Sequence, residues 1–142
     1  MQIGVESARA VENKRIFVVE SDEIIRSALQ FMLHDENETH ELAGLAQAYA
    51  KGIDWKPDLI LLGLAIVQDN GVNVLAEVAA RLPGAKILLV ADTPTDPFVQ
   101  TCLESGAHDV LGKPITIEAV RHKVDVVLGR YKPPMIPLDI LT

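Results

Sequence analysis

The chain of 142 residues has only one cysteine, no long apolar run and no cluster of basic residues. Because Cys102 has no partner for an internal disulfide, the cysteine pattern gives no sign of an oxidising compartment. The longest apolar runs, such as residues 59–62 and 87–91, are far too short to cross a bilayer. Residues 1–10 lack the basic start and apolar stretch of a secretory signal. We therefore expect a cytoplasmic protein without a membrane contact.

Acidic residues outnumber basic ones, with 20 Asp and Glu against 13 Lys and Arg, which gives a formal net charge of −7. A phosphate backbone repels such a surface, so we expect no direct nucleic-acid binding by this segment. Apolar residues make up 49% of the chain and charged residues 23%, which is typical of a folded globular protein. A chain of this length is expected to form one domain with a sizeable core.

Short apolar segments alternate with amphipathic ones along the chain. Five segments have the composition of strands, namely residues 16–19, 40–46, 58–62, 87–90 and 110–111. Apolar residues at helical spacing predict five helices, near residues 25–33, 47–53, 75–82, 97–105 and 117–130. Strands that are apolar throughout are buried on both faces, so the pattern predicts an α/β domain with a five-stranded parallel sheet covered by helices on both sides.

This alternation accounts for residues 15–130 and sets apart the two ends of the chain. Residues 1–14 have no clear period and are expected to form an arm, and the proline-containing residues 131–142 a tail or linker. In doubly wound sheets, ligands bind at the carboxyl ends of the strands, near the point where strand order reverses. We expect the residues at those ends to surround one shallow pocket. They are Glu20, Ser21, Asp22, Gly63, Ala91 and Lys113.

Several local patterns together resemble the receiver domains of response regulators, the α/β domains of two-component signalling. The patterns are Pro57-Asp58 before the apolar run, Asn70-Gly71, the Glu-Ser-Gly-Ala stretch at residues 104–107, and Lys113-Pro114. The resemblance spans roughly residues 14–130. It implies the flavodoxin-like (βα)5 fold and a part in phosphorelay signal transduction, without an enzyme activity.

The resemblance also shows which site positions of the family are altered here. In receiver domains an acidic pair binds Mg²⁺, an Asp accepts the phosphoryl group, and a Ser or Thr and a Lys bind its oxygens. The acidic pair falls on Glu20 and Ser21, and the acceptor position falls on Gly63. The hydroxyl position falls on Ala91, and the lysine is retained as Lys113.

Two further family positions also differ, since the aromatic switch falls on Val110 and the proline after the acceptor falls on Val67. A glycine offers no carboxylate nucleophile, and an alanine cannot donate a hydrogen bond to a phosphoryl oxygen. We therefore predict a pseudo-receiver that is not phosphorylated, with no catalytic residue. We expect no cofactor and no Mg²⁺, because the hard oxygen ligands of that ion are largely missing. Glu20 and Asp22 are expected to begin the following helix instead.

Such a domain is expected to act through protein–protein interaction with a sensor kinase, an output domain or an adaptor. The resemblance places the partner face, or the face of a homodimer, on the fourth helix, fifth strand and fifth helix, at residues 96–105, 109–111 and 115–129. We expect a Lys113–Glu20 contact, or one with Asp22, to lock the pocket. Two alternatives remain open. Either the chain is the input domain of a longer regulator with a DNA-binding or enzymatic output beyond Thr142, or the pocket binds a small anion or metabolite.

Overall fold

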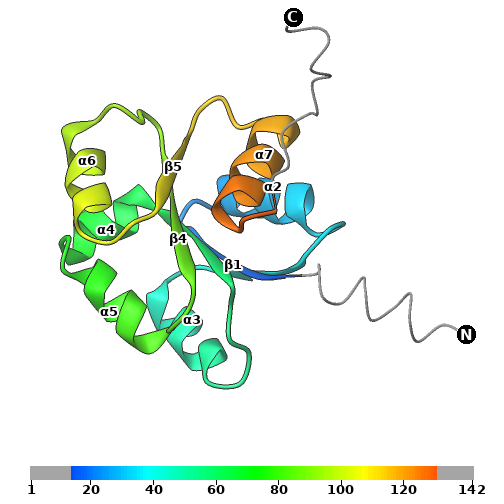
Figure 1. Cartoon of the computed structure of the whole chain (residues 1–142), viewed down its shortest axis with the longest axis horizontal. Helices are drawn as coiled ribbons and strands as arrows, with labels where there is room; N and C mark the ends of the chain where they lie inside the picture. Colours follow the sequence, from blue (N-terminus) through cyan, green and yellow to red (C-terminus); the bar gives the residue numbers. More distant parts are fainter. Residues whose placement is uncertain (1–13, 131–142) are drawn as a thin grey trace, which may run out of the picture.

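The computed structural model describes residues 14–130 as a five-stranded parallel sheet with helices on both faces (Figure 1). The strands are β1 (Arg15–Val19), β2 (Glu38–Leu42), β3 (Leu59–Gly63), β4 (Lys86–Ala91) and β5 (Asp109–Gly112). The helices are α2 (Glu23–Leu33), α3 (Leu45–Gly52), α4 (Leu64–Asn70), α5 (Val74–Arg81), α6 (Pro97–Glu104) and α7 (Ile117–Val127). The predicted arm, apart from Lys14, and the predicted tail lie outside the described residues.

The strand order is β2-β1-β3-β4-β5, with every neighbouring pair parallel. In β1, Phe17 and Val19 pack against the layer of helices α3 to α6, whereas Ile16 and Val18 pack against α2 and α7. Both faces of the inner strands are therefore buried, which explains why these strands show no polar alternation in the sequence. The predicted fold class, a doubly wound sheet with flavodoxin-like strand order, is confirmed. None of the helices within residues 14–130 has the length and apolar character needed to span a bilayer.

The second strand lies earlier in the chain than the predicted segment 40–46. It runs over Glu38–Leu42 and pairs residue by residue with β1, from Arg15 opposite Glu38 to Val19 opposite Leu42. As an edge strand, β2 is only partly buried and carries polar residues that an apolar pattern does not detect. The next helix consequently begins at Leu45, two residues before the predicted start near residue 47.

A sixth helix in the described part of the chain was not predicted. Residues 64–70, to which no element was assigned from the sequence, form α4. Leu64, Ile66 and Val67 of this helix are buried against the sheet. Val67 occupies the position at which the family has a proline, and a valine leaves the helical amide and the backbone geometry available. The missing proline therefore permits a helix at this position.

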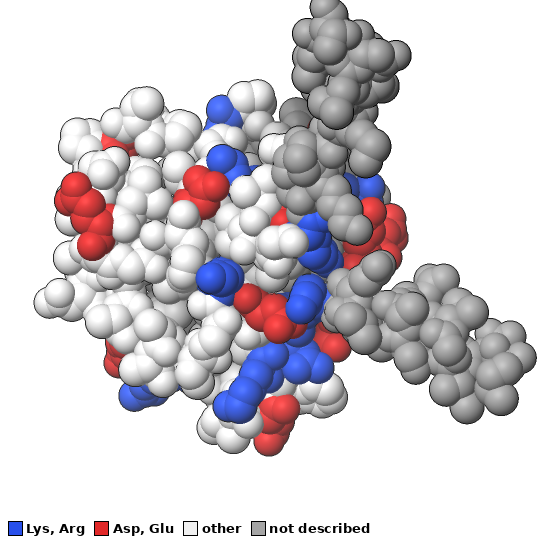
Figure 2. All heavy atoms as spheres, viewed as in Figure 1, with Lys and Arg blue, Asp and Glu red and all other residues white. Residues whose placement is uncertain are grey.

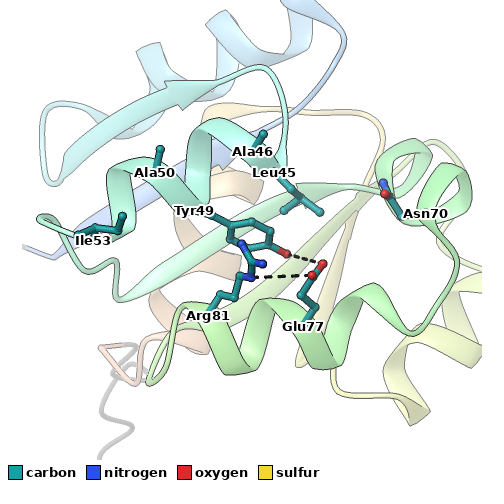
Figure 3. A pocket seen from close by; sticks show the side chains of 8 residues that line it. All are labelled: Leu45, Ala46, Tyr49, Ala50, Ile53, Asn70, Glu77 and Arg81. Carbon is teal, nitrogen blue, oxygen red and sulfur yellow. Dashed lines mark hydrogen bonds and ion pairs between the residues drawn. The ribbon is translucent and has the colours of Figure 1, made fainter.

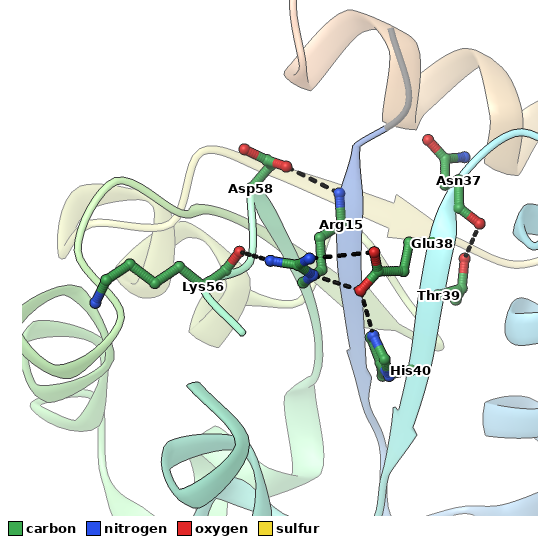
Figure 4. A network of polar contacts seen from close by, with 7 residues as sticks. All are labelled: Arg15, Asn37, Glu38, Thr39, His40, Lys56 and Asp58. Carbon is green, nitrogen blue, oxygen red and sulfur yellow. Dashed lines mark hydrogen bonds and ion pairs between the residues drawn. The ribbon is translucent and has the colours of Figure 1, made fainter. Parts of the chain in front are cut away.

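A polar cluster joins the amino ends of three strands, away from the predicted site (Figure 4). The Arg15 guanidinium forms two hydrogen bonds with the Glu38 carboxylate, and the Arg15 amide donates to Asp58 Oδ2 at 2.8 Å. Glu38 also contacts His40 Nε2 at 2.8 Å, and the Arg15 guanidinium lies 5.1 Å from the Trp55 ring centre. The Arg15 hydrogen bonds hold the pKa of Glu38 at about 2. This cluster fixes β2 and β3 on either side of β1.

Candidate functional site

The predicted site lies where the strand order reverses, at the carboxyl ends of β1 and β3. The strand that follows β1 in the chain, β2, lies on one side of β1, and β3 lies on the other side. The connections that follow β1 and β3 therefore lead in opposite directions along the sheet. A hollow of about 380 Å³ opens there. Its lining residues are Glu20, Ser21, Asp22, Ile25, Leu64, Ala65, Gln68, Val90, Asp92, Thr93 and Asp96. The structure thus brings the predicted residues of the β1–α2 loop together with several that the sequence did not single out.

Gly63 ends β3 directly beside the carboxylate of Glu20. A Cβ atom built on Gly63 would lie 2.6 Å from Glu20 Oε1 and 2.9 Å from both Cδ and Oε2. In an aspartate, the carboxylate oxygens lie roughly 2.4 Å from Cβ, as bond lengths dictate. The Glu20 carboxylate therefore occupies the space that an acceptor side chain at position 63 would enter. No sequence pattern indicates this contact, because the two residues are far apart in the chain.

Glu20 is held in this position from several directions. Its side chain is buried, with 6% of the residue exposed, and Oε2 accepts a hydrogen bond from the Asp22 amide at 3.0 Å. Its own backbone amide donates to the Leu42 carbonyl at 3.1 Å, and its carbonyl accepts from Arg26 Nη1 at 2.7 Å. These bonds attach the loop after β1 to both β2 and α2. The buried carboxylate is thus a fixed part of the site.

Asp22 serves as the N-cap of α2, so the expectation that Glu20 and Asp22 both begin this helix is correct for Asp22 only. Its Oδ1 accepts hydrogen bonds from the Ile24 amide at 2.9 Å and the Ile25 amide at 3.1 Å. Glu20 does not cap the helix and points toward Gly63 instead. Ser21 between them is exposed at the edge of the hollow.

Lys113 pairs with Asp92 rather than with Glu20 or Asp22, so the predicted contact is wrong. The Lys113 Nζ to Asp92 Oδ1 distance is 3.0 Å, and the two side chains are 47% and 81% exposed. The strand register explains this choice, because Ala91 pairs with Gly112 and the next residues of both strands are therefore neighbours. The Glu20 carboxylate instead lies beside Gly63 and accepts a hydrogen bond from the Asp22 amide. The exposed ion pair contributes at most about 1 kcal/mol.

The loop after β4 packs onto the end of β5. A Cβ atom built on Gly112 would lie 2.3 Å from Pro94 Cγ, so the Pro94 ring lies directly on this glycine. Ala91, at the family's hydroxyl position, is 3% exposed and belongs to the core beneath α3 to α6. Val110, at the switch position, is partly buried and packs against the same core. Both side chains contribute to packing and offer no polar group to the hollow.

The carboxylates around the hollow do not fit a magnesium site. Glu20 accepts from the Asp22 amide, Asp22 caps α2, Asp92 pairs with Lys113, and Asp96 Oδ1 caps α6 by accepting from the Phe98 amide at 2.8 Å. Across residues 14–130, no three His, Cys, Asp or Glu side chains converge in a way that would hold a metal ion. The position that would supply a bridging carboxylate is Gly63.

Comparison with known proteins places this architecture in a family. The response regulator receiver domain model matches residues 16–125. The transcriptional regulatory protein PdtaR of Mycobacterium tuberculosis is 24% identical over 129 residues, which cover 88% of this chain and 62% of PdtaR. The chemotaxis protein CheY of Thermotoga maritima is 26% identical over 105 residues, covering 71% of this chain and 86% of CheY. The chain thus spans about three-fifths of the length of PdtaR.

Solved structures show the same fold. A response regulator from Thermotoga maritima superposes with a TM-score of 0.75 at 16% identity, covering 82% of this chain and 98% of that one. The receiver domain of the sensor histidine kinase PA1611 from Pseudomonas aeruginosa, solved with magnesium in its active site cleft, superposes with a TM-score of 0.70 at 20% identity. This superposition covers 82% of this chain and 98% of the PA1611 receiver domain chain. The match to residues 16–125, more than half of the sequence, shows that the chain belongs to the response regulator receiver domain family.

Proposed function

We propose that this chain is a receiver domain that is not phosphorylated and that acts in two-component signalling through protein–protein contact. One observation carries the proposal, namely the buried Glu20 carboxylate in the space beside Gly63. The acceptor position has no nucleophile. The carboxylate that lies beside it comes from β1, is 6% exposed and already accepts the Asp22 amide. It is poorly exposed to an incoming phosphoryl donor.

The test is incubation with acetyl phosphate and Mg²⁺, followed by intact-protein mass spectrometry. We expect no added phosphoryl group, whereas a receiver domain with an aspartate at the acceptor position should gain one under the same conditions. Glu20→Gln is the matched variant, since it keeps the side-chain shape and removes the carboxylate nearest to Gly63. A hydroxylamine-labile adduct on the wild-type chain that Glu20→Gln abolishes would show Glu20 to be an acceptor and would refute the proposal.

We further propose that the site binds no Mg²⁺ at physiological concentration. Mg²⁺ requires near-octahedral coordination by oxygen ligands. The carboxylates of this site are committed to helix caps, a backbone amide and Lys113. Isothermal titration with MgCl₂ should give no binding heat beyond dilution. A millimolar or tighter dissociation constant that Glu20→Gln weakens would contradict this expectation.

The face made of α6, β5 and α7 is the proposed site of contact with a sensor kinase, an output domain or an adaptor. Ile117 and Val126 of α7 expose apolar side chains there, at 37% and 41%. The Lys113–Asp92 pair and the Pro94 contact on Gly112 tie together the two loops beside this face. A homodimer through this face is the alternative use of the same surface. A photo-crosslinker at Val126 should capture the cellular partner, while one at Trp55, in the loop between α3 and β3, should not.

Two other candidate functions are an input domain with an output domain beyond Thr142 and a pocket for a small anion. An output domain beyond Thr142 is favoured by the length of PdtaR, of which this chain spans 62%. A small anion in the hollow is disfavoured, because its lining includes four acidic side chains and Lys113 is already paired with one of them, Asp92. On the face shown in Figure 2, basic and acidic side chains are intermixed, which argues against direct nucleic-acid binding by the described residues. We propose a cytoplasmic location, as the family resemblance implies.

A further inference from the structure

A second and larger hollow lies between α3 and α5, on the face of the sheet opposite α2 and α7 (Figure 3). We call it the α3–α5 groove, and it has a volume of about 660 Å³. Its lining residues are Leu45, Ala46, Tyr49, Ala50, Ile53, Asn70, Glu77 and Arg81. None of them lies at the altered acceptor site, so the groove is independent of the phosphorylation chemistry.

The floor of the groove is an ordered aromatic and ionic cluster. The Arg81 guanidinium lies 4.7 Å from the centre of the Tyr49 ring, and the Tyr49 hydroxyl donates to Glu77 Oε1 at 3.3 Å (Figure 3). Arg81 and Glu77 also form an ion pair at 3.8 Å along α5, with both side chains about half exposed. These contacts position the Tyr49, Glu77 and Arg81 side chains relative to one another. The Arg81 guanidinium and the Glu77 carboxylate also remain about half exposed to a second surface.

The same patch carries a prominent apolar projection. Ile53 follows the last turn of α3 and is 77% exposed, and Ala46 and Ala50 are exposed on the same helix face at spacings of four and three residues. Small side chains allow a second helix to approach the backbone closely. A projection and a hollow on one patch meet the main requirement of a two-fold interface, in which the same surface must fit its own copy.

Charge separates this patch from two other surfaces, the hollow at the strand ends and the end of α2 around Phe31. Its ionic lining residues, Glu77 and Arg81, sum to zero, although the whole chain carries −7. The hollow at the strand ends contains four acidic side chains, and the exposed Phe31 of α2 is followed by Asp35 and Glu36. A two-fold contact at either acidic surface brings like charges together, which is unfavourable. The groove carries no such net charge, because its ionic lining residues Glu77 and Arg81 have opposite signs.

We propose that the α3–α5 groove is a self-association surface, on which two copies of this chain pack their α3 helices antiparallel and each Ile53 enters the groove of the other copy. The two-fold axis then passes near Ala50, midway between Ala46 and Ile53 along the helix. This arrangement leaves the α6–β5–α7 face free for a signalling partner. It goes beyond the proposed function and does not depend on whether the acceptor site is active.

Sedimentation equilibrium of the full chain over a wide concentration range tests the proposal. We expect a monomer–dimer equilibrium that Ile53→Asp shifts to monomer, since burial of a charged carboxylate in the groove of the other copy is unfavourable. Val126→Asp on α7 and Ile24→Asp on α2 are the matched controls, because both remove an exposed apolar side chain elsewhere. Far-UV circular dichroism should show all three variants folded. A monomer at every concentration, or a dimer that Val126→Asp rather than Ile53→Asp dissociates, would overturn the proposal.

Disulfide trapping gives a second and independent measurement. Ala50→Cys should form a covalent dimer under mild oxidation, because symmetric cysteines near a two-fold axis approach within bonding distance. Ser27→Cys on the exposed side of α2 is the control and should remain monomeric. The native Cys102 is fully buried, and burial raises the pKa of its thiol, so it adds little background. Equal trapping of both variants would show random collision and would count against the groove.

Discussion

Replacement of Gly63 by alanine tests directly whether the Glu20 carboxylate fills the acceptor position. The backbone of Gly63, at φ −61° and ψ 135°, suits any residue, so strain does not enter. The added methyl carbon would lie 2.6 Å from Glu20 Oε1, whereas ordinary contacts begin at 3.4 Å. Glu20 must therefore move by about 0.8 Å, the difference of these two distances.

The expected magnitude follows from what opposes that movement. Glu20 is buried and its carboxylate is held by the Asp22 amide at 3.0 Å. Overpacking at such a site costs about 1–3 kcal/mol. The alanine also restricts the unfolded chain, which stabilises the fold by about 0.4–1 kcal/mol. We expect Gly63→Ala to lower the free energy of unfolding by about 1.3 kcal/mol, the difference between the midpoints of these two ranges.

A double-mutant cycle with Glu20→Ala isolates the contact. Without the Glu20 side chain the methyl group meets no obstacle, so Gly63→Ala should become stabilising by about 0.4–1 kcal/mol. The difference between the two backgrounds, a coupling of about 1–3 kcal/mol, is the quantity of interest. Urea unfolding followed by circular dichroism measures all four proteins. If Gly63→Ala changes the free energy of unfolding equally in both backgrounds, Glu20 does not occupy the position and the reasoning fails.

Two further predictions concern ion pairs. Because Arg15 lowers the pKa of Glu38 from 4.5 to about 2, the stabilisation is present above pH 4.5 and is lost as the pH falls toward 2. Glu38→Gln should therefore lower the free energy of unfolding by about 1 kcal/mol at pH 7 and by nothing near pH 2, and Glu36→Gln should change neither value. Lys113→Ala and Asp92→Ala should each cost less than about 1 kcal/mol, with equal effects in urea unfolding; a larger loss for Lys113→Ala alone would indicate another partner.

Most of the fold could be predicted because burial on both faces of the sheet requires an apolar pattern that is easy to recognise in the sequence. Strands such as β3 and β4 must be apolar at nearly every position, and residues such as Asp96 and Gly106 mark helix ends by their side-chain or backbone chemistry. The misplaced strand and the missed helix have other causes. The edge strand β2 is polar because only part of it is buried, and α4 forms where the family has a proline.

The sequence by itself determined that position 63 carries no nucleophile, since the identity of a residue is independent of the fold. Which atoms fill the resulting space was decided by the tertiary structure, because the order β2-β1-β3 places the ends of β1 and β3 side by side. The same holds for Lys113, whose partner Asp92 follows from the pairing of Ala91 with Gly112. Residue types limit the chemistry of a site, whereas strand order and register decide which side chains meet there.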